Sequence, residues 1–133
     1  MKSLTPPVPS VVVFVTDVPR LSRFYRDVAM MRVVHEGPDH AVLSLDGFEV
    51  VVHALRGEPP VQKGPSGDPL VREDSYVKLC LPVDSIAAAR ARAAESGGAL
   101  GPPDREWEGS GFRACDGHDP EGNVIQVREP APR

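Results

Sequence analysis

The sequence predicts an α+β fold in which two βαβββ modules, each with a small curved sheet, share one cavity. The first observation is a repeat: residues 11–55 favour strand, helix and three strands, and residues 78–127 favour the same order again. Two copies of about 45–50 residues are too few for a solenoid, which needs three or more. The second observation is size, since 133 residues suit one domain with its own core.

We therefore treat residues 1–133 as one domain. Module one covers about 10–55, a linker covers 56–74, and module two covers about 75–129. The linker is rich in Pro and Gly, which prevent a regular element. A connection of this length is either a mobile lid or a tether, and we favour the tether.

Module one opens with a strand at 10–16, whose β-branched run predicts burial on both faces. A helix is predicted at 18–30, because Asp17 is a good N-cap and Pro19 is tolerated in the first turn. Four apolar residues share one face of that helix: Leu21, Phe24, Tyr25 and Val28. Strands are then predicted at 32–36, 40–45 and 48–54, with turns at 37–39 and at Asp46-Gly47.

Module two repeats this order. A strand is predicted at 76–81, and Asp84 or Ser85 caps an Ala-rich helix at 84–96, which Gly97-Gly98 ends. The remaining strands are predicted at 104–108, 111–116 and 123–128.

Bulk properties exclude some functions. The net charge of −4 argues against a nucleic-acid partner. No apolar run approaches the roughly 20 residues that span a membrane, so no membrane partner is predicted. Prolines occupy the place of a signal-peptide core, so we expect a cytoplasmic protein. In that reducing compartment Cys80 and Cys115 are predicted to be small core residues; a catalytic thiol is the alternative, and no neighbouring motif supports it.

Four short segments resemble the vicinal oxygen chelate superfamily, which includes glyoxalase I, extradiol dioxygenases, fosfomycin-resistance enzymes and bleomycin-resistance proteins. They are 15–18, 24–28, 112–116 and the closing turn Asp119-Pro120-Glu121-Gly122-Asn123. The resemblance covers residues 10–128 and implies two βαβββ modules that form half-open barrels. Many members are homodimers, so a homodimer is expected here.

The resemblance also implies where a metal would sit. Catalytic members hold a divalent ion with His and Glu at four equivalent positions, which here are Ser10, Val51, Lys78 and Gln126. Valine offers no donor, and a lysine ammonium has no lone pair. One neutral Gln oxygen does not make a site. We therefore expect that the protein holds no metal and no cofactor. In this respect the sequence is most similar to the metal-free, bleomycin-resistance-like members of the superfamily.

The four histidines do not replace those ligands. His35 and His40 flank a turn, and His118 lies in a loop, where hydrogen bonding within the turn explains it. His53 has the strand parity of Val51 and so faces the same side. His53 therefore lines the cavity, or it is a core residue whose ring nitrogens are hydrogen-bonded.

The stretch around Trp107 resembles the corresponding part of bleomycin-resistance proteins, which bind the drug in crevices at the dimer interface. Trp107 and Phe112 offer flat faces for stacking a planar ligand, and Glu106 and Glu108 would favour a cationic one. The alternative is that Trp107 is a hydrophobic plug in the barrel.

The leading hypothesis is a homodimer that sequesters a planar or polycyclic, antibiotic-like small molecule. Its predicted ligand-binding residues are Trp107, His53, Lys78, Gln126, Ser10 and Phe112, with Lys78, Gln126 and Ser10 as polar anchors. No catalytic residue is assigned. The alternatives are a metal-independent isomerase or cyclase using Lys78 or His53 as acid or base, and a metal-dependent glyoxalase- or dioxygenase-like enzyme.

Overall fold

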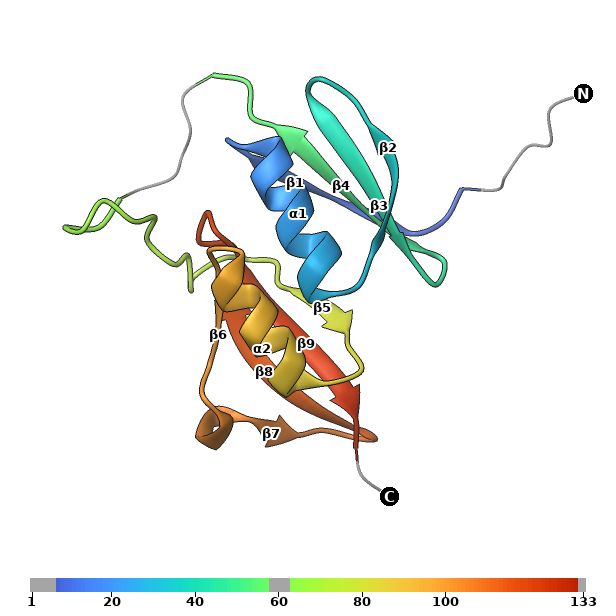
Figure 1. The fold of residues 1–133 in the computed structure, drawn as a ribbon, viewed down its shortest axis with the longest axis vertical. Helices are drawn as coiled ribbons and strands as arrows, with labels where there is room; N and C mark the ends of the chain where they lie inside the picture. The colour runs from blue at the N-terminus through green and yellow to red at the C-terminus, as the bar shows by residue number, and fades with distance from the viewer. Residues whose placement is uncertain (1–6, 58–62, 132–133) are drawn as a thin grey trace, which may run out of the picture.

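A computed structural model describes residues 7–57 and 63–131 of the chain. Each module contains one helix and one mixed sheet, and within these residues neither sheet closes into a barrel (Figure 1). The elements are β1 (Ser10–Val15), α1 (Val18–Val28), β2 (Arg32–Glu36), β3 (His40–Leu45), β4 (Phe48–Ala54), β5 (Leu79–Pro82), α2 (Ile86–Glu95), β6 (Ala99–Leu100), the 3₁₀ helix η1 (Pro103–Arg105), β7 (Trp107–Glu108), β8 (Phe112–His118) and β9 (Val124–Pro130). The predicted α+β fold of two modules is confirmed.

The first sheet has the strand order β1-β4-β3-β2, with β1 parallel to β4 and the other pairs antiparallel. Its central hairpin turns at Asp46 and Gly47, whose φ angles are 47° and 81°. Positive φ at both central residues is the conformation that a two-residue hairpin needs. The turn fixes the register, so Leu45 pairs with Phe48 and His40 pairs with His53.

Helix α1 covers one face of this sheet. The Asp17 carboxylate caps it by accepting a hydrogen bond of 3.1 Å from the Arg20 amide. Leu21, Phe24 and Tyr25 on its inner face are fully buried. The helix ends at Val28, two residues earlier than predicted.

The second sheet has the order β5-β9-β8-β6, and β7 also pairs with β8. Helix α2 covers one face of it and is capped by Ser85, which accepts from the Ala88 amide at 3.1 Å. Ala89 and Ala93 are buried, so the inner face of this helix is made of small side chains. The two helices lie side by side and pack against each other (Figure 1).

Two predicted strands of module two are wrong in their bounds. The single strand predicted at 104–108 is replaced by two short strands, β6 and β7, with η1 between them. Pro102 and Pro103 cause this, because proline has no N–H to donate to a ladder. The strand predicted at 76–81 begins only at Leu79. In the register of β5 with β9, Asn123 lies opposite the residues that precede Leu79, but its amide already donates a hydrogen bond to Asp119 in the closing turn.

The linker contains a docked segment. Its residues 58–62 lie outside the described residues, but the Arg72 amide donates a hydrogen bond of 2.8 Å to the carbonyl of Gly122. Gly122 has a φ of 82°, and a Cβ there would overlap the carbonyl oxygen of Leu70. The end of the linker is therefore fitted closely against the closing turn.

The closing turn joins the modules through two carboxylates. Glu121 accepts hydrogen bonds from the amides of Thr16 and Asp17 and from the Thr16 hydroxyl, at 2.6–3.0 Å. Asp119 is fully buried and accepts 2.6 Å from the Tyr25 hydroxyl of α1. Module two thus holds the start of the first helix in place.

None of the helices in the described residues has the length and apolar character that crossing a membrane requires.

Candidate functional site

Each sheet has one face under its helix and one face without a helix. Side chains alternate along a strand, so neighbours in sequence lie on opposite faces. We call the uncovered face of the second sheet the module-two open face. It carries Lys78, Cys80, Trp107, Phe112, Asp116, Gln126 and Arg128.

Asp116 is the polar centre of the module-two open face. Its Oδ1 accepts 3.0 Å from Gln126 Nε2 and 3.3 Å from Lys78 Nζ. Partial burial raises the pKa of Asp116, but hydrogen bonds from Gln126 and Lys78, the Lys78 charge and the nearby Trp107 indole outweigh this and keep the pKa below its ordinary value. Asp116 is therefore a carboxylate, and it orients two of the predicted site residues, Lys78 and Gln126.

An aromatic and guanidinium stack lies beside this centre. The Arg128 guanidinium carbon is 4.3 Å from the centroid of the Phe112 ring. The Trp107 and Phe112 rings meet edge to face, with centroids 5.9 Å apart. Arg128 Nε donates 2.6 Å to Gln126 Oε1, which joins the stack to the polar centre.

Four predicted site residues therefore share one face: Lys78, Trp107, Phe112 and Gln126. Sequence reasoning missed Asp116 and Arg128. The closing turn could have predicted both residues. It joins β8 to β9 and fixes their register, so that Asp116 pairs with Gln126 and Arg128 lies two residues further along the same face. Trp107 is 42 % exposed and so is not a buried plug.

The two cysteines differ. Cys115 is fully buried, as predicted, but the expectation that Cys80 belongs to the core is wrong. Leu81 is the β5 residue that points into the core, and alternation places Cys80 on the open face. Its sulfur accepts a weak hydrogen bond from Arg128 Nη2 at 3.6 Å.

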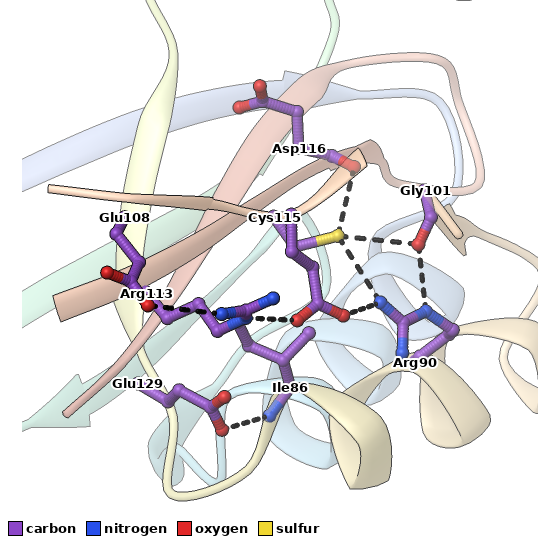
Figure 2. A network of polar contacts seen from close by, with 9 residues as sticks. Ile86, Arg90, Gly101, Glu108, Arg113, Cys115, Asp116 and Glu129 are labelled. Atoms are coloured by element: carbon purple, nitrogen blue, oxygen red, sulfur yellow. Dashed lines mark hydrogen bonds and ion pairs between the residues drawn. The ribbon is translucent and has the colours of Figure 1, made fainter. Parts of the chain in front are cut away.

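Glu106 and Glu108 lie on the opposite face, against the prediction that they attract a cationic ligand. Glu106 accepts from Arg90 of α2 and, at 2.7 Å, from Arg113 Nε, while Glu108 is 3.4 Å from Arg113 Nη1. Figure 2 shows this network beneath the sheet, with the Asp116 carboxylate pointing away from it. Strand parity explains the error, because both residues alternate with Trp107.

Because Glu106 is paired with two arginines, we expect the free energy of unfolding to depend on pH. Arg90 and then Arg113 lower the pKa of Glu106, so the stabilisation exists above the ordinary glutamate pKa and is lost as pH falls through the lowered value. Glu106→Gln is expected to reduce the free energy of unfolding by about 1–2 kcal/mol at neutral pH. Urea unfolding should show the difference from the unaltered protein shrinking below about pH 4.3.

The control for this prediction is Glu108→Gln, because Glu108 shares Arg113 but its side chain is 65 % exposed. It should change stability by no more than about 0.5 kcal/mol. A Glu106→Gln difference of the same size at neutral and acid pH would contradict the assignment.

Ser10 and His53 lie on the first sheet instead, on the face without a helix. Ser10 pairs with Glu49 at the start of β1, and Val51 lies between Val12 and Val42. Across residues 7–57 and 63–131, no hydrogen bond, ion pair or ring contact links Ser10 or His53 with the module-two open face. The structure therefore does not gather the six predicted residues into one group.

His53 belongs to a row of rings that crosses all four strands of the first sheet. Its ring is 5.8 Å from Phe14 and 5.9 Å from His40, and His40 is 5.0 Å from His35. The sequence contained this signal, since a two-residue turn at 46–47 places residues 40 and 53 opposite each other. Interpreting His35 and His40 only as turn residues missed it.

A metal would find poor ligands here. Lys78 and Gln126 are both engaged with Asp116 in module two, while Ser10 and Val51 lie in module one. In the part of the chain that the structure describes, no three His, Cys, Asp or Glu side chains are grouped to hold an ion. The donors do not fit a divalent metal, because valine and the lysine ammonium provide none. The absence of a metal stays a prediction.

Several hollows lie where the modules meet, and two of them adjoin the uncovered faces of the sheets. One of about 390 Å³ is lined by Leu45 of the first sheet and by Pro82, Phe112 and Arg128 of the second. The other, of about 220 Å³, lies between β1 and the segment leading into β5, with Arg72 in its wall. The first extends the module-two open face beyond its aromatic stack.

The fold is shared by several solved structures. A protein from Albidiferax ferrireducens titled a glyoxalase/bleomycin resistance protein is 16 % identical over 92 % of this chain and 98 % of its own, with a TM-score of 0.67. An integron cassette protein from the mobile metagenome of V. cholerae is 22 % identical over 98 % and 99 %, with a TM-score of 0.63. A fosfomycin resistance protein from Mesorhizobium loti is 14 % identical over 98 % and 94 %, with a TM-score of 0.62.

The comparison with curated proteins gave no match. The family model described as a glyoxalase-like domain matches residues 10–128, the range over which the sequence motifs resemble the vicinal oxygen chelate superfamily. The chain belongs to the glyoxalase-like domain family.

Proposed function

We propose that this protein binds and sequesters a planar, antibiotic-like small molecule on the module-two open face. The observation that carries the proposal is Trp107, which is 42 % exposed although it packs edge to face on Phe112. Large aromatic surface left uncovered beside fixed polar groups is typical of a small-molecule site. Lys78, Asp116 and Gln126 supply those polar groups.

Binding is favoured over catalysis by the state of the candidate acid and base residues. An isomerase or cyclase would need Lys78 buried, but its side chain is 42 % exposed in an ion pair with Asp116. His53 Nδ1 is hydrogen-bonded to the Ala54 carbonyl at 2.8 Å, on the other sheet. Sequestration needs affinity alone, which suits a face with no arranged catalytic group.

The proposal includes a cytoplasmic homodimer. On the uncovered face of the first sheet, Val12 is 47 % exposed and Phe14 is 54 % exposed. Val12 and Phe14 are two residues apart in β1 and so are neighbours on one face of the sheet. Exposed apolar side chains next to each other indicate a surface that a second copy or a ligand covers. Two similar structures are a glyoxalase/bleomycin resistance protein and a fosfomycin resistance protein, which supports an antibiotic-like ligand.

The test is a fluorescence titration, since Trp107 is the only tryptophan. A panel should contain a bithiazole-containing antibiotic, a polycyclic intercalator and naphthalene compounds of different charge. At least one is expected to quench Trp107 with saturation, because stacking places its ring against the indole. The ligand should then be recovered chemically unchanged by mass spectrometry. Turnover of the ligand, or a panel without any binding, would contradict sequestration.

A further inference from the structure

We propose that the module-two open face selects a planar anion, an aromatic carboxylate whose oxyanion binds the guanidinium of Arg128. This inference rests on the proposed function and specifies its ligand class. It also reverses the cationic preference that the sequence favoured, because Glu106 and Glu108 lie on the opposite face of the sheet.

Arg128 is held in place before any ligand arrives. Its guanidinium carbon lies over the Phe112 ring, 4.3 Å from the centroid, Nε donates to Gln126 Oε1 at 2.6 Å, and Nη2 lies 3.6 Å from Cys80 Sγ. Gln126 is itself fixed by its bond to Asp116. A guanidinium has five N–H donors, so these contacts leave donors free in a fixed orientation. A fixed planar fork is the group that recognises a carboxylate by two parallel hydrogen bonds.

The charge of Arg128 is not neutralised by a neighbour. In the described residues, Arg90 and Arg113 both form ion pairs with Glu106, whereas no carboxylate forms an ion pair with Arg128. Its partners are an amide oxygen, a thiol and an aromatic ring, all of them uncharged acceptors. Arg128 is therefore a positioned cation without a counter-ion.

The surroundings set the direction from which the anion approaches. Asp46 and Asp84 line the hollow of about 390 Å³ on one side of Arg128, where they disfavour an anion. On the other side, Asp116 is paired with Lys78 at 3.3 Å, and Trp107 offers its open ring. A ring that stacks on Trp107 thus brings its carboxylate to Arg128 from the Trp107 side.

The experiment compares three ligands of one shape: naphthalene-2-carboxylate, naphthalene-2-carboxamide and 2-(aminomethyl)naphthalene, titrated by calorimetry. The acid is expected to bind about 10- to 100-fold more tightly than the amide, as charge-assisted hydrogen bonds to a carboxylate require. The amine should bind most weakly. If none of the three binds, the anion inference fails, and the proposed function fails with it only when the whole fluorescence panel also shows no binding. If the amide or amine binds as tightly as the acid, only the anion inference fails.

Variants locate the effect. Arg128→Gln should bring the affinity for the acid down to that for the amide and leave the amide itself within about threefold, which also shows that the variant is folded. Arg128→Lys keeps the charge but not the planar fork, so its affinity for the acid should lie between that of the unaltered protein and that of Arg128→Gln. The matched control is Arg113→Gln, on the neighbouring strand and the opposite face, which should keep the full preference for the acid. An Arg128→Gln variant that still prefers the acid would overturn the inference.

Discussion

Asp119→Ala is expected to lower the free energy of unfolding by about 3–5 kcal/mol, enough to threaten a domain of this size. The carboxylate accepts from the Tyr25 hydroxyl at 2.6 Å, from the amides of Glu121 and Asn123 at 2.9 and 3.0 Å, and from Asn123 Nδ2 at 2.8 Å. Burial raises the pKa of Asp119, and these four hydrogen bonds offset part of that cost. The substitution leaves buried donors without a partner in both modules.

Urea unfolding of three variants tests this prediction. Tyr25→Phe removes one donor and is expected to cost only about 1 kcal/mol. Asp104→Ala is the control, since Asp104 is exposed in η1, and should change stability by less than about 0.5 kcal/mol. An Asp119→Ala loss no larger than that of Tyr25→Phe would show that the closing turn does not join the modules energetically.

Trp107→Ala is expected to weaken binding of a planar ligand by about 1–3 kcal/mol, the range for losing a stacked aromatic and its buried area. Its effect on the free energy of unfolding should be much smaller than the roughly 3–5 kcal/mol of a core tryptophan, because the indole is 42 % exposed. Calorimetry with the tightest-binding member of the panel measures the first quantity, and urea unfolding measures the second.

Trp107→Phe is the matched control, because it keeps a flat ring but loses the indole N–H beside Asp116. It should recover most of the affinity if stacking is the main contribution. Lost stability with unchanged affinity in Trp107→Ala would move the binding site away from this face, toward His53 and the ring row of the first sheet.

The fold followed from local signals. The Asp17 cap, the apolar face of α1 and the Asp46-Gly47 turn each act over a few residues, and each was predicted in place. One error in module two has a local cause as well, since Pro102 and Pro103 interrupt the chain before the strand predicted at 104–108. The start of β5 was not predictable in this way, because it depends on which residues of β9 are free to pair.

The arrangement of the candidate residues was predicted in part, and strand parity explains which part. Lys78, Gln126, Trp107 and Phe112 lie on one face because the repeat and the closing turn align their strands. That they bind a ligand stays a prediction. Glu106, one residue before Trp107, was assigned to the same side, although alternation places it on the opposite face, where it pairs with Arg90 and Arg113.

By itself the sequence determined the two modules, their order of elements, the family and the lack of metal-ligating side chains at Ser10, Val51, Lys78 and Gln126. Only the tertiary structure decided that Arg128 lies over Phe112 with no ion-pair partner among the described residues, and that Glu106 pairs with Arg90 and Arg113. The reason is physical: propensity, capping and turn chemistry act between near neighbours in the chain. Which charges meet depends on the register and on the side-chain face, and those are set by packing between distant strands.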